Sequence, residues 1–160
     1  LMGMDYSMAH ADYLSNAQVA MNAAQSRLEE LMATPFATLR DPAGLFGQAQ
    51  TAAGQCMGMG EDRNCNGTLD PGEDLNGNGV LDEPLPGGRL TVQIKDLDGT
   101  APDASSILLT LHVSACWTTR GRRIGEDQNC NGRLEAGEDA NGTGWAESPA
   151  MVSTRVAVSD

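Results

Sequence analysis

The sequence has few aromatic and few basic side chains, which narrows the functions open to it. Aromatic residues make up 4% of the 160 residues, so a core would be built mainly from Leu, Val, Ile, Met and Ala. Lysine and arginine total 10 against 22 acids, and no basic patch occurs beyond Arg120, Arg122 and Arg123. We expect no nucleic-acid partner, because binding a phosphate backbone requires clustered positive charge.

Histidine is almost absent as well, since His10 and His112 are the two in the chain. Neither stands at zinc-ligand spacing, and the sequence contains no Cys-x-x-Cys pair. No general base stands beside a nucleophile, so we do not expect an enzyme. We find no signal peptide and no apolar run long enough for a membrane span.

Apolar residues recur at helical spacing near the N-terminus, where Arg27 falls off their stripe. The stripe consists of Leu14, Ala17, Met21, Ala24, Leu28 and Leu31. Pro35 ends the helix, because the residue before a proline is pushed out of the helical region. We therefore predict an N-terminal helix over 1–34 and a globular β-sheet domain over 35–160. Residues 1–11 carry a displaced apolar face that we expect to project and contact other molecules.

Strand patterns follow the helix. Residues 89–96 alternate polar and apolar side chains, residues 106–119 form a longer strand, and residues 150–158 form the last one. Ile107 begins the apolar face of the second, and a short strand at 48–53 is a further candidate. The predicted fold is α+β, with a long N-terminal α-helix packed on a small antiparallel β-sheet.

The negative charge is concentrated in two segments. Residues 60–83 hold seven acids and 125–147 hold six, against only Arg63 and Arg133 as bases, so they contribute −11 of the net −12. Charges this dense repel one another and destabilise a compact fold unless something neutralises them. Divalent cations would do so.

The two acidic segments are also copies of each other. Residues 60–79 and 125–144 agree at fourteen of twenty positions, and both match a twelve-residue EF-hand-type calcium loop. Glycine at position 6 permits the sharp turn, position 7 offers a backbone carbonyl, and the acid at position 12 closes the oxygen shell. The candidate ligands at positions 1, 3, 5, 7, 9 and 12 are Asp62, Asn64, Asn66, Thr68, Asp70 and Glu73 in the first copy, and Asp127, Asn129, Asn131, Arg133, Glu135 and Glu138 in the second.

A second half-loop begins immediately after each twelve-residue loop. Its candidate ligands are Asp74, Asn76, Asn78, Val80 and Asp82 in the first copy, and Asp139, Asn141, Thr143, Trp145 and Glu147 in the second. Position 12 would fall on Leu85 or Ala150, so these half-loops cannot close as an EF-hand does, although Asp82 and Glu147 could supply a carboxylate. We expect two calcium sites, and up to four.

A metal-free set of Asx-turns is the alternative interpretation, because Asn, Asp and Gly favour turns in any case. It does not explain the acids at position 12 or the uncompensated charge. Pro71, Gly72 and Gly137 oppose an exiting helix, so we predict calcium loops on a β scaffold rather than a helix–loop–helix sensor.

The four cysteines make an even number, which favours disulfides formed in an oxidising compartment. Four cysteines allow three pairings. We favour Cys56–Cys65 with Cys116–Cys130, because each loop then pairs with its own upstream cysteine. The main rival is Cys65–Cys130 with Cys56–Cys116, which would tie the two loops together.

Two stretches resemble a known family. The segment 20–36, Ala-Met-Asn-Ala-Ala-Gln-Ser-Arg-Leu-Glu-Glu-Leu-Met-Ala-Thr-Pro-Phe, is similar to the helix end of type IV prepilins and type II secretion pseudopilins. The stretch Val113-Ser-Ala-Cys-Trp through Gly125-Glu-Asp, then Ser148-Pro-Ala-Met-Val, resembles prepilin-type proteins with Gly-Glu-Asp/Asn-Gly insertions. Together these cover about half of the chain. The prepilin cleavage motif and the first apolar half of the helix are absent from this sequence.

The resemblance implies a structural subunit of a type IV pilus or pseudopilus-like filament, assembled through its N-terminal helix. Its partners would be copies of itself or related pilin subunits, with the inner membrane before assembly if an apolar segment precedes Leu1. It would lie in an extracellular, cell-surface filament or a periplasmic pseudopilus. The alternative is a calcium-dependent extracellular binding module, dockerin- or adhesin-like, but dockerins carry a helix after each loop.

Overall fold

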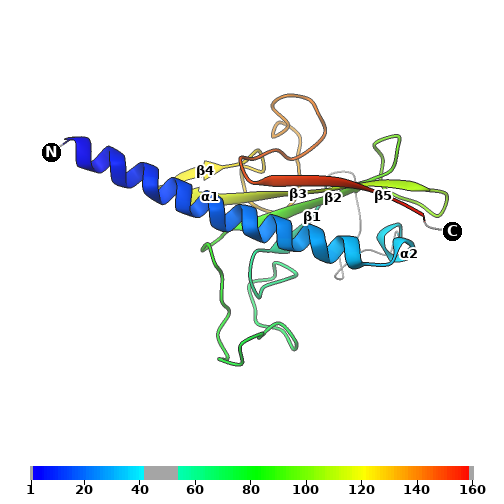
Figure 1. Cartoon of the computed structure of the whole chain (residues 1–160), viewed down its shortest axis with the longest axis horizontal. Helices are drawn as coiled ribbons and strands as arrows, with labels where there is room; N and C mark the ends of the chain where they lie inside the picture. Colours follow the sequence, from blue (N-terminus) through cyan, green and yellow to red (C-terminus); the bar gives the residue numbers. More distant parts are fainter. Residues whose placement is uncertain (1, 42–53, 159–160) are drawn as a thin grey trace.

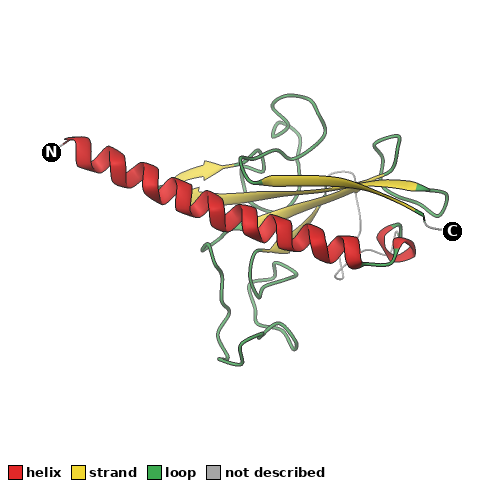
Figure 2. Cartoon of the chain, viewed as in Figure 1, coloured by secondary structure: helices red, strands yellow, loops and turns green. Residues whose placement is uncertain are grey.

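One long helix crosses one face of a five-stranded antiparallel sheet (Figure 1), as the secondary-structure colouring of Figure 2 shows. The computed structural model describes residues 2–41 and 54–158. Helix α1 spans Met2–Ala33, and a single turn, α2, spans Phe36–Leu39. The predicted α+β plan is confirmed.

The sheet has the strand order β1-β2-β3-β4, and β5 pairs with β3. Its strands are β1 Gln55–Gly58, β2 Arg89–Lys95, β3 Leu108–Thr119, β4 Arg122–Ile124 and β5 Met151–Ala157. The three main predicted strands correspond to β2, β3 and β5. Strands β1 and β4 and the turn α2 were not predicted, and the candidate strand at 48–53 lies outside the described residues.

Helix α1 packs on the sheet through a seam of small and apolar side chains. Ala20, Ala24 and Leu31 have no exposed surface, and α1 contacts β3 and β5. The predicted stripe was wrong at two positions: Leu14 is 53% exposed, and Arg27, expected off the stripe, is buried. Arg27 is buried with a hydrogen-bond partner, because its guanidinium donates to the carbonyl of Gly58 at 3.0 Å.

Strand β3 lies at the centre of the sheet and supplies much of the core. Leu109, Leu111 and Val113 are fully buried, as the alternation predicted. Ile107 was expected to begin this face but is 68% exposed, because the strand starts one residue later.

The N-terminal turns of α1 extend past the end of the sheet, while its C-terminal half lies across the strands (Figure 1). Within the described part of the chain, neither helix combines the length and the apolar character that a membrane crossing needs. The expectation that residues 1–11 contact other molecules stays a prediction.

Candidate metal-binding loops

The polar face of β2 is buried beneath the two acidic loops. Its apolar residues Leu90, Val92 and Ile94 join the core on the helix side. Alternation places the polar residues on the opposite face, where Thr91, Gln93 and Lys95 are also buried. Strand β2 was predicted to be half-buried. It is covered on both faces, because the loops pack on the polar face that was predicted to contact solvent.

Two disulfides tie the loops to this sheet. Cys56 of β1 bonds Cys65, and Cys116 of β3 bonds Cys130, so the favoured pairing is confirmed and its rival is wrong. Cys65 and Cys130 both occupy position 4 of their loops, and both have left-handed backbone angles, φ 59° and 53°. The two bonds indicate an oxidising, extracellular or periplasmic environment.

The same hydrogen-bond pattern occurs four times, once in each loop and half-loop. The aspartate at position 1 accepts the backbone N–H groups of positions 5 and 6, one on each carboxylate oxygen, at 2.8–3.1 Å. These residues are Asp62, Asp74, Asp127 and Asp139. The glycine at position 6 has φ between 72° and 78° in all four, which gives the sharp turn that the sequence predicted.

The acid at position 9 gathers the side chains of positions 3 and 5. Asp70, Asp82 and Glu135 accept hydrogen bonds from two asparagine amides each, at 2.7–3.0 Å. Glu147 accepts from Asn141 and from the hydroxyl of Thr143. The amides of Asn64 and Asn66 lower the pKa of Asp70, because they favour its ionised form. The side chains at positions 3, 5 and 9 of each loop therefore lie together, and metal binding by them stays a prediction.

The glutamate at position 12 closes each full loop. The carboxylate of Glu73 accepts the N–H groups of Arg63 and Asp70, at positions 2 and 9, both at 3.0 Å. Glu138 does the same with Gln128 and Glu135, at 3.0 and 2.9 Å. Both glutamates are buried.

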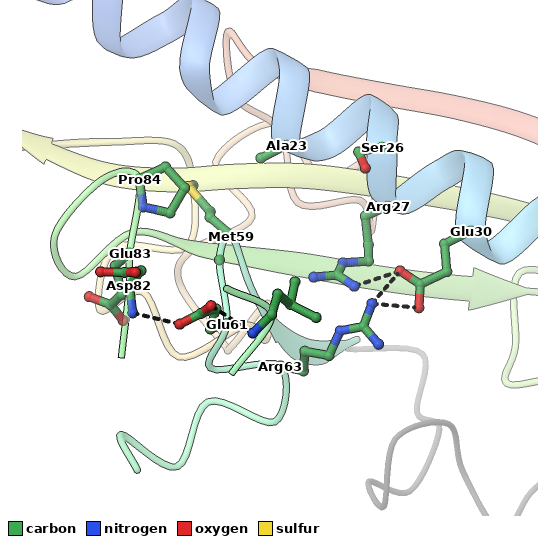
Figure 3. Close-up of a pocket in the computed structure, with 12 residues that line it drawn as sticks. Ala23, Ser26, Arg27, Glu30, Met59, Glu61, Arg63, Asp82, Glu83 and Pro84 are labelled. Carbon is green, nitrogen blue, oxygen red and sulfur yellow. Dashed lines mark hydrogen bonds and ion pairs between the residues drawn. The ribbon is translucent and has the colours of Figure 1, made fainter. Parts of the chain in front are cut away.

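Each half-loop is closed by a glutamate that the sequence analysis missed. Glu61 accepts the N–H groups of Leu75 and Asp82, again positions 2 and 9, at 2.9 and 3.1 Å (Figure 3). Glu126 accepts the N–H of Glu147 at 3.0 Å. Glu61 therefore stands where Glu73 and Glu138 stand in the full loops, although it precedes its half-loop in the chain, and Glu126 shares the contact to position 9.

A sequence signal for these two residues existed. The triplet Gly-Glu-Asp occurs at 60–62 and again at 72–74, and likewise at 125–127 and 137–139. Each glutamate thus precedes the position-1 aspartate of one loop and closes the other. The EF-hand spacing places the closing acid after position 1 in the chain, so it does not predict a closing glutamate that precedes position 1.

The residue at position 7 follows the glycine that forms the turn in each loop. Calcium binding by its backbone carbonyl stays a prediction. Thr68, Val80 and Arg133 are exposed, and Trp145 is half-buried. Lys95 lies over the Trp145 ring, with its ammonium 4.1 Å from the ring centroid, and also donates to the carbonyl of Gly144. The ring therefore helps to hold the second half-loop on the sheet.

Side chains of the sheet hold each loop in place. Arg89 contacts Asp62 at 3.3 Å, and the Thr91 hydroxyl donates to Asp127 at 3.0 Å. Gln93 donates to the carbonyl of Gly144, and His112 Nε2 lies 2.7 Å from the carbonyl oxygen of Ala146. Burial lowers the pKa of His112, which favours the neutral ring in this contact.

The two position-1 aspartates of the full loops are almost inaccessible, with 1% of Asp62 and 2% of Asp127 exposed. Burial raises the pKa of Asp127, opposed by the hydrogen bonds from Gly132, Asn131 and Thr91. Carboxylates this buried need hydrogen bonds or a cation to remain ionised.

The first loop also contacts helix α1. Arg63 bonds Glu30 at 3.2 Å, and Glu30 bonds Arg27 at 2.6 Å, beside a cleft of about 470 Å³ between the helix and the loop (Figure 3). Burial lowers the pKa of Arg27, while the charge of Glu30 acts in the opposite direction. The corresponding position in the second loop is Gln128, which carries no charge.

The donor set of these loops consists of oxygen atoms from carboxylates, amides and backbone. Within the described residues, no three His, Cys, Asp or Glu side chains form a ready metal cluster. Calcium accepts amide and carbonyl oxygens alongside carboxylates, so mixed loops of this kind fit it better than zinc or another thiol- or imidazole-binding metal.

Comparison with known proteins identifies no relative: no protein family, curated protein or solved structure matches this chain.

Proposed function

We propose that the chain is a structural subunit of a type IV pilus or pseudopilus-like filament, assembled through α1 and stabilised by calcium in its two surface loops. The observation that carries the filament role is the placement of α1, whose C-terminal half lies on the sheet while its N-terminal turns extend past it (Figure 1). Apolar residues in that extension, including Met4 and Met8, would then pack against neighbouring subunits.

The calcium role is supported by the fourfold recurrence of one loop geometry with EF-hand spacing. Asp62, Asp70 and Glu73 would hold an ion in the first full loop, with Asn64 and Asn66 supplying amide oxygens. The second full loop offers the equivalent set around Asp127. The ion would supply positive charge that offsets the dense carboxylates and fixes the loops on the sheet. The dockerin-like alternative is less favoured, because no helix follows either loop at 60–88 or 125–150, all of which are described.

We further propose that Glu61 and Glu126 complete ion sites in the half-loops, giving four sites per chain. Glu61→Gln and Glu126→Gln should each lower the number of bound calcium ions from four to three, because each removes one closing carboxylate. Bound calcium is counted by native mass spectrometry after equilibration with excess calcium. Asp98→Asn, which neutralises an exposed acid outside the loops, is the matched control and should leave four. Four ions in Glu61→Gln would show that this residue closes no site.

Assembly through α1 predicts that Met8→Glu prevents incorporation into filaments while the folded sheet persists. A charge on the projecting segment would have to be buried between subunits, and its desolvation would cost roughly several kcal/mol. Immunogold labelling of filaments sheared from producing cells measures incorporation, and circular dichroism checks the fold. Gln25→Glu places the same charge on an exposed position of α1 that lies over the sheet, and should label normally. Normal labelling of Met8→Glu, or no filament labelling of the wild type, contradicts the assembly role.

A further inference from the structure

The two full loops receive different donors from β2 at the same atom. In the first loop, Arg89 Nη2 lies 3.3 Å from Asp62 Oδ2; in the second, Thr91 Oγ1 donates to Asp127 Oδ2 at 3.0 Å. The other hydrogen bonds of the two aspartates match, since both accept from positions 5 and 6. Arg89 and Thr91 are two residues apart on one strand, so a single sheet face contacts both loops.

The difference between the two donors is one unit of charge. Arg89 brings a permanent positive charge to Asp62, and its side chain is only 17% exposed. Thr91 satisfies Asp127 without charge, and no ion pair joins Asp127 to a basic side chain among residues 2–41 and 54–158. The first position-1 carboxylate is therefore already paired with a cation, and the second is not.

Other nearby charges do not cancel this difference. Glu83 bonds Arg89 at 2.6 Å and reduces its field at Asp62, but it does not remove the direct contact. Arg63, at position 2 of the first loop, is directed to Glu30 on α1. Arg133, in the second loop, is exposed, so water screens its charge. The buried Arg89–Asp62 contact is thus the main electrostatic asymmetry between the copies.

We propose that Arg89 is an internal cation that competes with calcium for Asp62, so that the second full loop fills before the first. This inference rests on the proposed calcium binding and adds an order of occupancy to it. An ion at Asp62 would lie within a few ångströms of a guanidinium that the protein screens poorly, and the repulsion weakens binding there. The second loop presents carboxylates at the same positions, with Glu135 in place of an aspartate at position 9, and its Asp127 contacts a neutral hydroxyl that does not repel the ion.

The amides of Gly67 and Gly132 allow the two loops to be followed separately in the intact chain. Both donate to the position-1 aspartate of their own loop, so their NMR signals report the local ion. In a calcium titration of the wild type, the Gly132 signal should move at a concentration roughly tenfold below that which moves Gly67. In Arg89→Gln, the Gly67 midpoint should fall by about the same factor, while the Gly132 midpoint stays unchanged.

Arg89→Lys keeps the charge and should leave the order as it is in the wild type. An unchanged Gly67 midpoint in Arg89→Gln, or a wild type in which Gly67 moves together with or before Gly132, would overturn the proposal while calcium binding stands. If calcium moves neither signal in the wild type, the proposed calcium function fails, and the order of filling fails with it.

Discussion

Calcium is expected to raise the midpoint of thermal unfolding by roughly 10–20 °C. One site filled at 100 times its dissociation constant adds about 2.7 kcal/mol to the free energy of unfolding. The two full loops would together add about 5 kcal/mol by the same relation. In a chain of this size, each kcal/mol moves the midpoint by about 2–4 °C. The effect is large because the ion replaces carboxylate repulsion inside both loops.

Differential scanning calorimetry of the intact, disulfide-bonded chain measures this shift, with calcium and with a chelator. Glu73→Gln and Glu138→Gln should each reduce the calcium-dependent gain, because each weakens one full loop. Both variants should remain folded in chelator, where the ion contributes nothing. A midpoint that is the same in calcium and chelator would mean that the loops are metal-independent Asx-turns.

Gly132→Ala is expected to destabilise the chain by more than about 3 kcal/mol, the range of severe core overpacking. A Cβ atom at Gly132 would lie 2.1 Å from Cys56 Cα and 2.3 Å from Cys56 Cβ, so the loop could not remain seated on β1. Gly67 occupies the equivalent position of the first loop, with the same left-handed φ, but a Cβ there meets nothing within 4 Å. Gly67→Ala should therefore cost only the backbone strain, about 1–2 kcal/mol.

Denaturant unfolding of the two variants in chelator separates loop seating from metal binding. A large loss in Gly132→Ala beside a small loss in Gly67→Ala is the expected result, since both share the φ penalty. Equal losses would mean that the second loop does not pack against β1 as described. Gly67 and Gly132 therefore occupy equivalent positions in two nearly identical segments but have different neighbours in the fold.

Periodicity in the sequence was enough to predict the main elements of the fold. The three- and four-residue steps in α1 and the alternation in β2 and β3 reflect apolar side chains directed to one core, which a sequence pattern records directly, although β2 is buried on its polar face as well. Strands β1 and β4 have four and three residues and are too short to show a period. The burial of Arg27 depends on the carbonyl of Gly58, which lies 31 residues away and leaves no local trace.

The loops were predictable to the extent that their candidate ligands follow one another along the chain. The side chains at positions 3, 5 and 9 lie together because consecutive residues curl around one point, a geometry that their spacing predicts. Glu61 and Glu126 reach their half-loops across space, and β2 contributes Arg89 and Thr91 from a different segment. Contacts of this kind depend on how the loops pack on the sheet, which local spacing does not encode.

Calcium binding by the loops is tested most directly by counting the ions that the purified wild-type chain retains. After treatment with chelator, equilibration with calcium and removal of free ions, elemental analysis gives the calcium content per chain. Four ions are expected, two in each loop and half-loop pair. Two ions would restrict binding to the full loops and exclude a closing role for Glu61 and Glu126. A content indistinguishable from zero, in chain whose disulfides are intact, would contradict calcium binding altogether.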